Sequence, residues 1–247
     1  MPRRSSPGPL AGPAVDERAA LLGRRERAKQ DKRERLVRAA RELFAEKGFA
    51  ETTTSEIARR ADVGTGTLFL YVQSKEELLV LVFQEDMSRV RDEAFATLPR
   101  RASFLDEIFH VYRMMAEYHE RDRTLARVYA KEVAFVRAPN RAGVQDFMER
   151  LLALSSARIA AATARGELAG DLPARGLSLN LFATFFLWLQ HALGTDLPLT
   201  APAYLAQLRE GLALQLRGLG PSAATTPTTP TTAAGRSARR RPHGGDA

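Results

Sequence analysis

Residues 53–75 read TTSEIARRADVGTGTLFLYVQSK, and this stretch decides the fold. Thr53 and Glu56 have the spacing of a capping box, in which each side chain satisfies a free amide at the start of a helix. Three small or branched apolar residues then recur at helical spacing: Ile57, Ala58 and Ala61. The sequence therefore predicts a helix that begins near Thr54 and presents a narrow apolar face to a close neighbour.

A sharp turn and a second short helix are expected next. Asp62 is among the residue types that tolerate a left-handed backbone, and Val63 can fill the centre between two crossing helices. Gly64 can serve as the N-cap of the second helix, which we expect over residues 65–71. Hydroxyls and glycine lead this helix and Leu68 anchors it, so its beginning is suited to a polar surface.

Flanking helices complete the unit. Upstream, apolar residues at helical spacing predict a helix that ends at Gly48, and they are Leu36, Ala39, Ala40, Leu43 and Phe44. Downstream, Ser74 is expected to cap a third helix whose start carries Lys75, where free amides and an ammonium favour a phosphate group. Two short helices joined by a tight turn are the layout of a unit that enters the DNA major groove.

Residues 38–79, RAARELFAEKGFAETTTSEIARRADVGTGTLFLYVQSKEELL, resemble the N-terminal DNA-binding signature of the tetracycline-repressor (TetR) family of bacterial transcription regulators. The apolar, glycine, hydroxyl and lysine residues of this stretch all match the family signature at their positions, and agreement of several independent features makes the resemblance specific. The resemblance implies an all-α fold, with an N-terminal three-helix helix-turn-helix DNA-binding domain and a C-terminal helical bundle that binds a ligand and dimerises. It also implies a regulator that is not an enzyme, with no catalytic residues, metal or cofactor.

The resemblance further implies which residues contact DNA. Nine positions match DNA-contacting positions of the family, and they are Thr53, Thr54, Ser55, Thr65, Gly66, Thr67, Leu70, Tyr71 and Lys75. Family members place phosphate contacts at the first two and at the lysine, and base contacts at residues 65–67. Small residues there let the backbone approach base edges, and threonine offers a hydroxyl and a methyl group. Phe69 replaces the family's usual tyrosine, so we expect the phosphate contact of that hydroxyl to be lost.

The residue pattern alone leaves other interpretations open. A capped pair of short helices with small residues also occurs as a tight hairpin inside a protein core. The pair Gly64 and Gly66 is a fragment of a phosphate-cradling nucleotide loop, but no strand precedes it and the third glycine is missing. We reject the nucleotide loop, and the full constellation favours DNA binding over the hairpin.

The net positive charge of the chain supports a nucleic-acid partner only if the charge lies in the folded part of the protein. The chain has 247 residues, a net charge of +8 and a pI of about 10.3. The first 27 residues carry six basic and three acidic side chains and the last 29 carry four and one, so residues 28–218 have a net charge of only +2. Bulk charge is therefore weak support for DNA binding. A local basic run at residues 24–35 either lies against DNA or is a solvated helix face with i, i+4 ion pairs.

Both ends are poor in large apolar residues, and we expect disorder in residues 1–27, a basic arm, and in residues 219–247, a Thr/Pro/Arg-rich tail. The remaining domains are expected at residues 28–88, which bind DNA, and residues 89–218, which bind an effector and dimerise. The longest apolar runs are far short of the roughly 20 residues that span a bilayer. With no cysteine in the chain, these features favour a cytoplasmic protein.

The second domain is expected as consecutive helices over residues 75–98, 103–120, 124–137, 141–165, 175–193 and 202–217. The last two are apolar over more than one stripe. A helix that is apolar on two sides must face both its own core and a partner, so the pattern predicts a homodimer through this pair. The alternative is that both are central core helices of a monomer.

The sequence says less about the effector. Polar and aromatic residues within apolar stretches are candidates to line a pocket for a small hydrophobic or amphipathic molecule, none of them favoured singly: His110, Tyr112, Tyr118, Tyr129, Asn180, Trp188 and His191. The preferred interpretation is a dimeric repressor that binds double-stranded DNA at a palindromic operator and is released by the effector. The alternatives are a DNA-binding regulator controlled by its abundance or a protein partner, and an enzyme. Against the enzyme, His110 and His119 are nine residues apart and do not stack as i, i+4 ligands.

Overall fold

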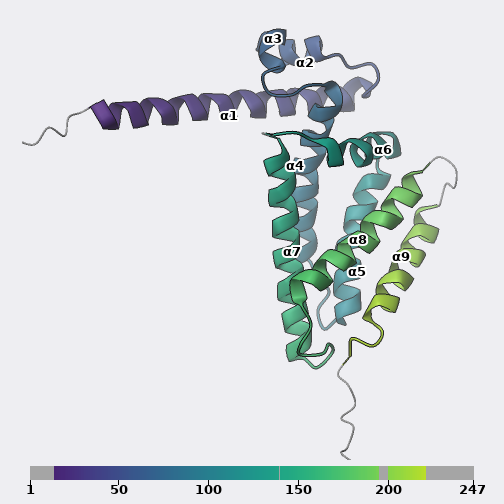
Figure 1. Cartoon of the computed structure of the whole chain (residues 1–247). Coiled ribbons are helices and arrows are strands. Elements are labelled where there is room, and N and C mark those ends of the chain that lie inside the picture. The colour runs from purple at the N-terminus through teal and green to yellow at the C-terminus, as the bar shows by residue number, and fades with distance from the viewer. Residues whose placement is uncertain (1–13, 139, 195–199, 221–247) are drawn as a thin grey trace, which may run out of the picture.

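The computed structural model describes residues 14–138, 140–194 and 200–220, with the side chains of residues 14–22 left aside (Figure 1). These residues form helices and connecting turns, without a strand. The elements are α1 (Ala14–Lys47), α2 (Thr54–Arg60), α3 (Thr65–Leu68), α4 (Lys75–Ala96), α5 (Phe104–Glu120), α6 (Arg123–Glu132), the 3₁₀ turn η1 (Val133–Phe135), α7 (Arg141–Ala164), α8 (Ala174–Leu193) and α9 (Ala201–Leu216). The all-α prediction is confirmed.

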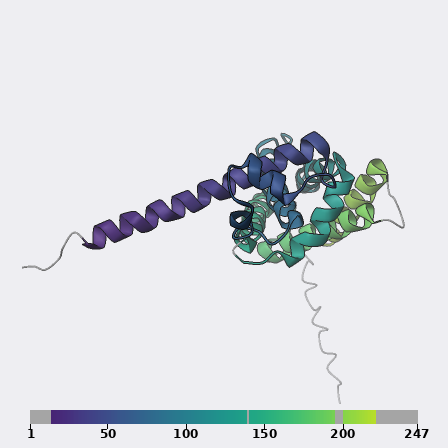
Figure 2. The same cartoon turned by 90° about the horizontal axis from the view of Figure 1, so that it is seen from above.

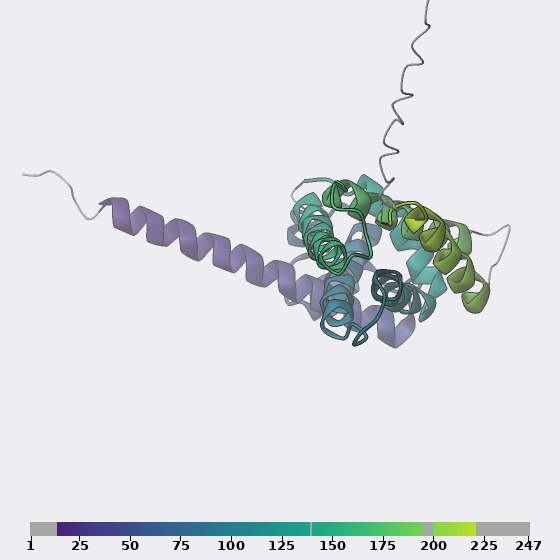
Figure 3. The ribbon, with the colours of Figure 1, turned by 90° about the horizontal axis from the view of Figure 1, so that it is seen from below.

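The helices form two groups joined by α4. Figure 1 shows α1, α2 and α3 gathered at one end of the molecule, while α5, α7, α8 and α9 run along the bundle with α4. α4 packs against α1 on one side and against α5, α6 and α7 on the other. Views from above and below show that the N-terminal part of α1 projects far outside the bundle (Figures 2 and 3).

The predicted helix caps and the left-handed turn residue of the DNA-binding unit are confirmed. α2 begins at Thr54 behind a complete capping box, in which the Thr53 hydroxyl accepts from the Glu56 amide and the Glu56 carboxylate accepts from the Thr53 amide at 2.9 Å. Asp62 has a left-handed backbone with φ of 54°. Gly64 precedes α3 as its N-cap, and the Ser74 hydroxyl accepts from the Glu77 amide to cap α4.

The second motif helix is shorter than expected. We predicted a helix over residues 65–71, but α3 ends at Leu68. The chain then tightens, because the amides of Leu70 and Tyr71 bond to carbonyls three residues earlier, those of Thr67 and Leu68. Such i to i+3 bonds are common where a helix ends and a buried residue must be brought inward. Val72 is that residue here, and it is buried.

The first helix is longer than expected. Residues 14–27, expected to be part of a disordered arm, belong to α1. The physical reason is composition: the run DERAALLGRRERAKQDKRERL is rich in Ala, Leu, Arg, Glu and Lys, all strong helix formers, with a single glycine at Gly23. Residues 1–13 and most of the expected C-terminal tail, 221–247, lie outside the described residues.

The helices of the second domain follow the predicted order with small shifts at their ends. The one expected over residues 124–137 is a clear difference, since α6 ends at Glu132 and tightens into η1 before the chain turns towards α7. Gly166, with φ of 75°, provides the left-handed conformation at the end of α7. A buried carboxylate also ties two helices together, because Glu107 of α5 accepts from the Arg158 guanidinium of α7 through two bonds of 2.8 Å.

α8 qualifies by length and composition alone as a helix that crosses a membrane, unlike the shorter apolar run LFATFFLWL considered in the sequence. Its neighbours account for this composition. α8 packs against α7 on one side and α9 on the other, and Leu181, Phe185 and Leu189 are buried in the bundle.

The capping box generates a prediction about acid stability. The Lys47 ammonium at 2.5 Å, together with the Thr53 hydroxyl and amide, holds the pKa of Glu56 at about 2, below its ordinary value of 4.5. Because the folded-state pKa is the lower one, this carboxylate contributes its full stabilisation above about pH 4.5 and loses it as the pH falls towards 2. We expect Lys47→Met to raise the pKa of Glu56 in a carboxyl NMR titration.

Lys131→Met is the matched control, because Lys131 is an exposed lysine of α6 beside Glu132 and should leave the titration of Glu56 unchanged. A wild-type midpoint near 4.5 would show that the capping box is not formed in solution.

Candidate nucleic-acid interface and apolar cavity

The residues expected to contact bases lie at the free end of the molecule, on and just after α3. Thr65 and Gly66 are exposed, Thr67 is half-buried and Leu70 is 79% exposed. Their support is apolar, since α3 packs against α2 and Leu68 is fully buried in the same core as Ile57. A short helix thus presents small side chains outward while a single leucine anchors it inward.

The other residues expected to contact DNA flank this helix; Ser55 matches a position where some family members contact a base, and the rest match contacts to the DNA backbone. Thr53 and Ser55 are exposed at the start of α2, and Thr54 between them is half-buried. The Thr53 hydroxyl also donates to the Glu56 carboxylate at 2.8 Å, so part of its bonding capacity serves the capping box. Tyr71 is half-buried and packs against the core of the unit.

Lys75 has an internal role that the sequence did not indicate. Its ammonium donates to the carbonyl oxygens of Phe49 and Ala50 at 2.7 and 3.1 Å, and it lies 4.3 Å from the centre of the Phe49 ring. An ammonium has three donors, so one remains for a phosphate after both carbonyls are bound. The lysine therefore joins the α1–α2 loop to the start of α4 and still offers a positive charge at the surface.

Ion pairs hold the motif on α1. The Arg60 guanidinium donates to both carboxylate oxygens of Glu46 at 2.8 and 2.9 Å and to Glu42 at 3.3 Å, which raises the pKa of Arg60. Arg35 lies 3.5 Å from the Asp62 carboxylate at the turn and at the same distance from Asp31, one helical turn away. These contacts fix the position of α2 and the turn relative to the long helix.

The basic run on α1 is helical, which agrees with either of its two interpretations. Of its seven cations only Arg35 is paired through an i, i+4 ion pair, with Asp31. The others form no ion pair with the side chains that the structure describes, and they are Arg24, Arg25, Arg27, Lys29, Lys32 and Arg33. The interpretation as a solvated face with i, i+4 ion pairs is therefore supported by one ion pair only. The other basic side chains of the run remain available to bind an anion.

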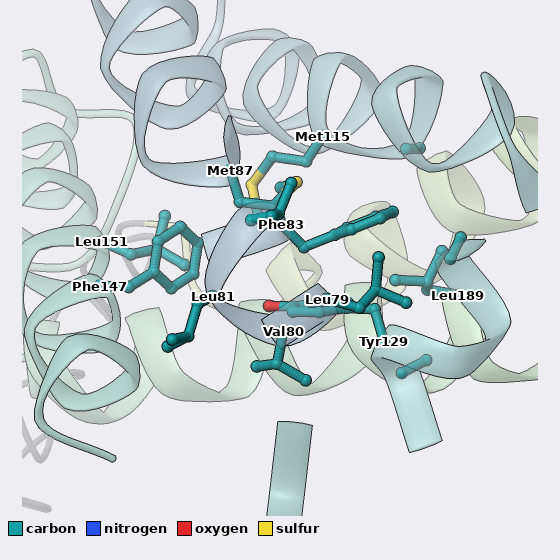
Figure 4. Close-up of a cluster of buried hydrophobic side chains, with 14 of the residues drawn as sticks. Leu79, Val80, Leu81, Phe83, Met87, Met115, Tyr129, Phe147, Leu151 and Leu189 are labelled. Atoms are coloured by element: carbon teal, nitrogen blue, oxygen red, sulfur yellow. The ribbon is translucent and has the colours of Figure 1, made fainter. Parts of the chain in front are cut away.

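An apolar cavity of about 200 Å³, partly open to the surface, lies among the second group of helices. α4, α5, α6, η1, α7 and α8 contribute its walls, which are mainly Met, Phe, Val and Leu side chains. Figure 4 shows part of the lining, with Met87 and Met115 near Phe83, Phe147 to one side, and Tyr129 and Leu189 to the other. Methionine side chains are flexible and adapt to varied apolar shapes, so this lining suits an apolar ligand.

Of the pocket candidates named from the sequence, Tyr129 alone lines this cavity. Tyr112 is fully buried and stacked on Phe185 with ring centres 4.9 Å apart, and the Tyr118 hydroxyl donates to Asp86 at 2.6 Å. His110 lies on the other side of α5, with Nε2 3.1 Å from the Thr97 hydroxyl. The remaining three, Asn180, Trp188 and His191, lie on α8 outside the cavity lining.

The sequence missed two polar residues at important positions. His119 lines the cavity, and its position on the buried face of α5, four residues after Met115, was a signal that periodicity could have revealed. Asn140 is buried at the start of α7, where its amide donates to the Tyr71 carbonyl at 2.8 Å and to the Glu77 carboxylate at 2.9 Å. Nothing in the local sequence indicates this contact, because it joins residues about 65 positions apart.

Comparisons with known proteins agree with this geometry. A family model described as "Bacterial regulatory proteins, tetR family" matches residues 36–82. The chain is 24% identical over 156 residues to the fatty acid metabolism regulator protein of Bacillus subtilis, covering 63% of this chain and 80% of that protein. It is 26% identical over 198 residues to the transcriptional repressor KstR of Mycobacterium tuberculosis, covering 78% and 88%.

Among solved structures, FadR of Thermus thermophilus, a TetR-family transcriptional repressor in complex with lauroyl-CoA, matches with a TM-score of 0.57 and 25% identity. The match covers 87% of this chain and 100% of that one. The matched family model spans α2, α3 and the turn between them, and the structural likeness extends through the helical bundle. The chain therefore belongs to the TetR family of bacterial transcriptional regulators, which bind DNA through a helix-turn-helix and are not enzymes.

Proposed function

We propose that the protein is a dimeric repressor that binds a palindromic operator in the cytoplasm and is released when an acyl chain enters the cavity. The observation that carries this proposal is one helix, α4, whose first turn supports the DNA-binding unit and whose Met87 lines the cavity. We divide the chain for this purpose at about residue 88, with residues 28–88 as the DNA-binding domain and residues 89–218 as the effector and dimerisation domain.

The exposure of residues 65–67 and Leu70 supports base reading by α3. Threonine at these positions can donate to a base edge and place a methyl group against thymine, while the glycine permits close approach. Lys75 and the hydroxyls at the start of α2 lie on the flanks, where phosphate contacts fix the register of a recognition helix. One α3 is short, so two copies about 34 Å apart on the duplex are needed for useful specificity.

An apolar surface on α8 and α9 supports the dimer. Leu187 is 69% exposed and Leu214 is 52% exposed, although each helix already buries another stripe in the bundle, through residues such as Phe185 and Leu212. Gly211 lets the two helices approach closely, because a Cβ there would lie 3.1 Å from the Trp188 ring nitrogen. Two such pairs, one from each subunit, would form a four-helix interface that buries these leucines.

The effector is proposed to be a long-chain acyl thioester. The cavity offers an almost entirely apolar lining for an alkyl chain, and the Thermus thermophilus relative was solved with lauroyl-CoA. A cavity of about 200 Å³ is smaller than the volumes typical of drug-sized ligand sites, which begin near 300 Å³. Entry of an acyl chain would therefore push the lining helices apart. The ligand would then bind the expanded conformation more tightly than the compact, DNA-binding conformation.

Two links carry such a movement towards DNA. α4 runs from the cavity to its Ser74 cap beside α3, and α7 carries Phe147 in the cavity wall and follows Asn140. Asn140 holds the Tyr71 carbonyl directly after α3. A shift of either helix would change the spacing of the two recognition helices in the dimer. Binding of the effector would therefore weaken binding of the operator, and binding of the operator would weaken binding of the effector by the same factor.

Operator reading is tested by two substitutions on DNA identified by footprinting beside the protein's own gene. Thr67→Ala should weaken operator binding by about tenfold and leave binding to random DNA unchanged, because it removes a base contact worth about 1–3 kcal/mol. Lys75→Ala should weaken both kinds of binding and reduce the salt slope by about 0.9, as one phosphate contact is lost. Equal effects of the two changes would contradict the assignment of α3 as the reader.

The dimer is tested by charge at the α8–α9 surface. Leu187→Glu combined with Leu214→Glu should give a monomer in sedimentation velocity and weaken operator binding by about a hundredfold or more, because the second half-site no longer benefits from linkage. Phe135→Glu is the matched control, since Phe135 is 74% exposed but lies on η1. A double variant that remains dimeric would place the interface elsewhere.

The effector is tested with lauroyl-CoA on the operator complex. It should stabilise the free protein by about 2.7 kcal/mol at 100 times its Kd and release the DNA, whereas coenzyme A alone should do neither. Val144→Trp, which fills the cavity from α7, should abolish release while operator binding persists. Operator binding that no acyl-CoA of any chain length alters would favour the regulator without a small-molecule effector.

A further inference from the structure

The most unusual group in the cavity wall is the side chain of His119. It is only 2% exposed, and its Nδ1 atom lies 2.7 Å from the carbonyl oxygen of Met115 in the same helix. A carbonyl oxygen accepts but cannot donate, so Nδ1 carries the proton of this bond. The other ring nitrogen, Nε2, is then a lone-pair acceptor.

Nε2 of His119 has no hydrogen-bond partner among the residues that the structure describes, and it is fully buried. Burial is the largest influence on this ring and lowers the pKa of His119, which keeps it neutral and Nε2 unprotonated at neutral pH. An acceptor buried without a partner is costly, and native proteins rarely keep one without a reason.

The described side chains around His119 do not donate to Nε2. Its ring lies among Phe83, Tyr118 and Tyr129, with ring centres 6.1, 6.1 and 5.9 Å away. The Tyr118 hydroxyl donates to Asp86 instead. Of the residues that line the cavity, Tyr129 is the only other one with a hydrogen-bonding side chain, and it makes no bond to His119. His119 contributes to the cavity lining, but Nε2 itself has almost no accessible surface, so a ligand reaches this atom only when the lining side chains move apart, as proposed for entry of the effector.

Other buried polar atoms without partners do not share this position. The hydroxyls of Tyr112, Ser155 and Tyr204 are also unsatisfied, but none of these residues lines the cavity. In the described part of the chain, His119 is therefore the residue that combines an unsatisfied buried acceptor with a place in the lining of this cavity.

We propose that the effector carries a hydroxyl or N–H group within its apolar part, and that this group donates a hydrogen bond to Nε2 of His119. The proposal rests on the cavity being the effector site, as in the proposed function, and it narrows the ligand class. A hydroxylated acyl chain or an alkylphenol satisfies Nε2, whereas a plain saturated chain leaves it unpaired. A hydroxylated acyl-CoA is therefore expected to bind more tightly than lauroyl-CoA, whose chain carries no donor.

The test compares two small probes that differ mainly in donor capacity, 4-propylphenol and its methyl ether 4-propylanisole. Titration calorimetry on the full-length wild-type protein should show the phenol binding at least about tenfold more tightly than the ether. This comparison needs no variant. In parallel, the ¹⁵N resonance of Nε2 in histidine-labelled protein should shift on addition of the phenol and not of the ether.

His119→Phe should bind both probes equally, because it keeps an aromatic ring of similar size and removes the acceptor. His110→Phe makes the same change on α5 outside the cavity and should retain the preference for the phenol. Equal binding of the two probes by the wild type, binding of neither at millimolar concentration, or a preference that survives in His119→Phe would each overturn the proposal.

These failures are distinct from a failure of the proposed function. If lauroyl-CoA releases operator DNA while the wild type treats phenol and ether alike, the cavity is an effector site and only the role of Nε2 is wrong. If no acyl-CoA binds but the phenol does so through His119, the acyl class is wrong and the donor requirement stands.

Discussion

The architecture depends on burying the start of α4 on every side. Six consecutive residues, Leu78 to Phe83, are each no more than 5% exposed. A surface helix needs only one apolar stripe, so a helix that is apolar all round must lie at the centre of its surroundings. Here the surroundings are α1 on the DNA-binding side and α5, α6 and α7 on the bundle side. This constraint places α4 at the centre of one hydrophobic core that extends from the DNA-binding unit into the bundle.

Because both groups of helices pack against α4 in this core, they cannot rearrange independently of it. Packed interiors respond to an added group by shifting whole elements, since they are as dense as organic crystals. Further contacts reinforce the connection at its DNA-side end: Lys75 binds the α1–α2 loop, and Asn140 brings the start of α7 against Tyr71 and Glu77. These polar contacts are short and directional, and in the proposed mechanism they would convert a helix shift into a displacement of α3.

The two ends of the molecule follow opposite chemical rules. At the DNA-binding end, small and hydroxylated side chains are exposed and a capping box with an acid-resistant carboxylate fixes their position. In the cavity, methionine and aromatic side chains form an almost entirely apolar lining, and a single histidine retains an unpaired acceptor. Adaptable apolar walls with few polar groups are common where one fold serves many ligands, so membership of the family does not specify the ligand.

Local sequence determined the DNA-binding unit, because its features act within a few residues: the capping box at Thr53, the left-handed turn at Asp62 and the helix caps at Gly64 and Ser74. The family, the all-α fold and the order of the helices followed from such signals and from apolar spacing. Tertiary structure alone decided that α3 stops at Leu68, that Lys75 binds backbone carbonyls, and that Asn140 and His119 occupy the junction and the cavity. Those outcomes depend on contacts between distant segments, and the free energy of a buried polar group is set by partners that local sequence does not name.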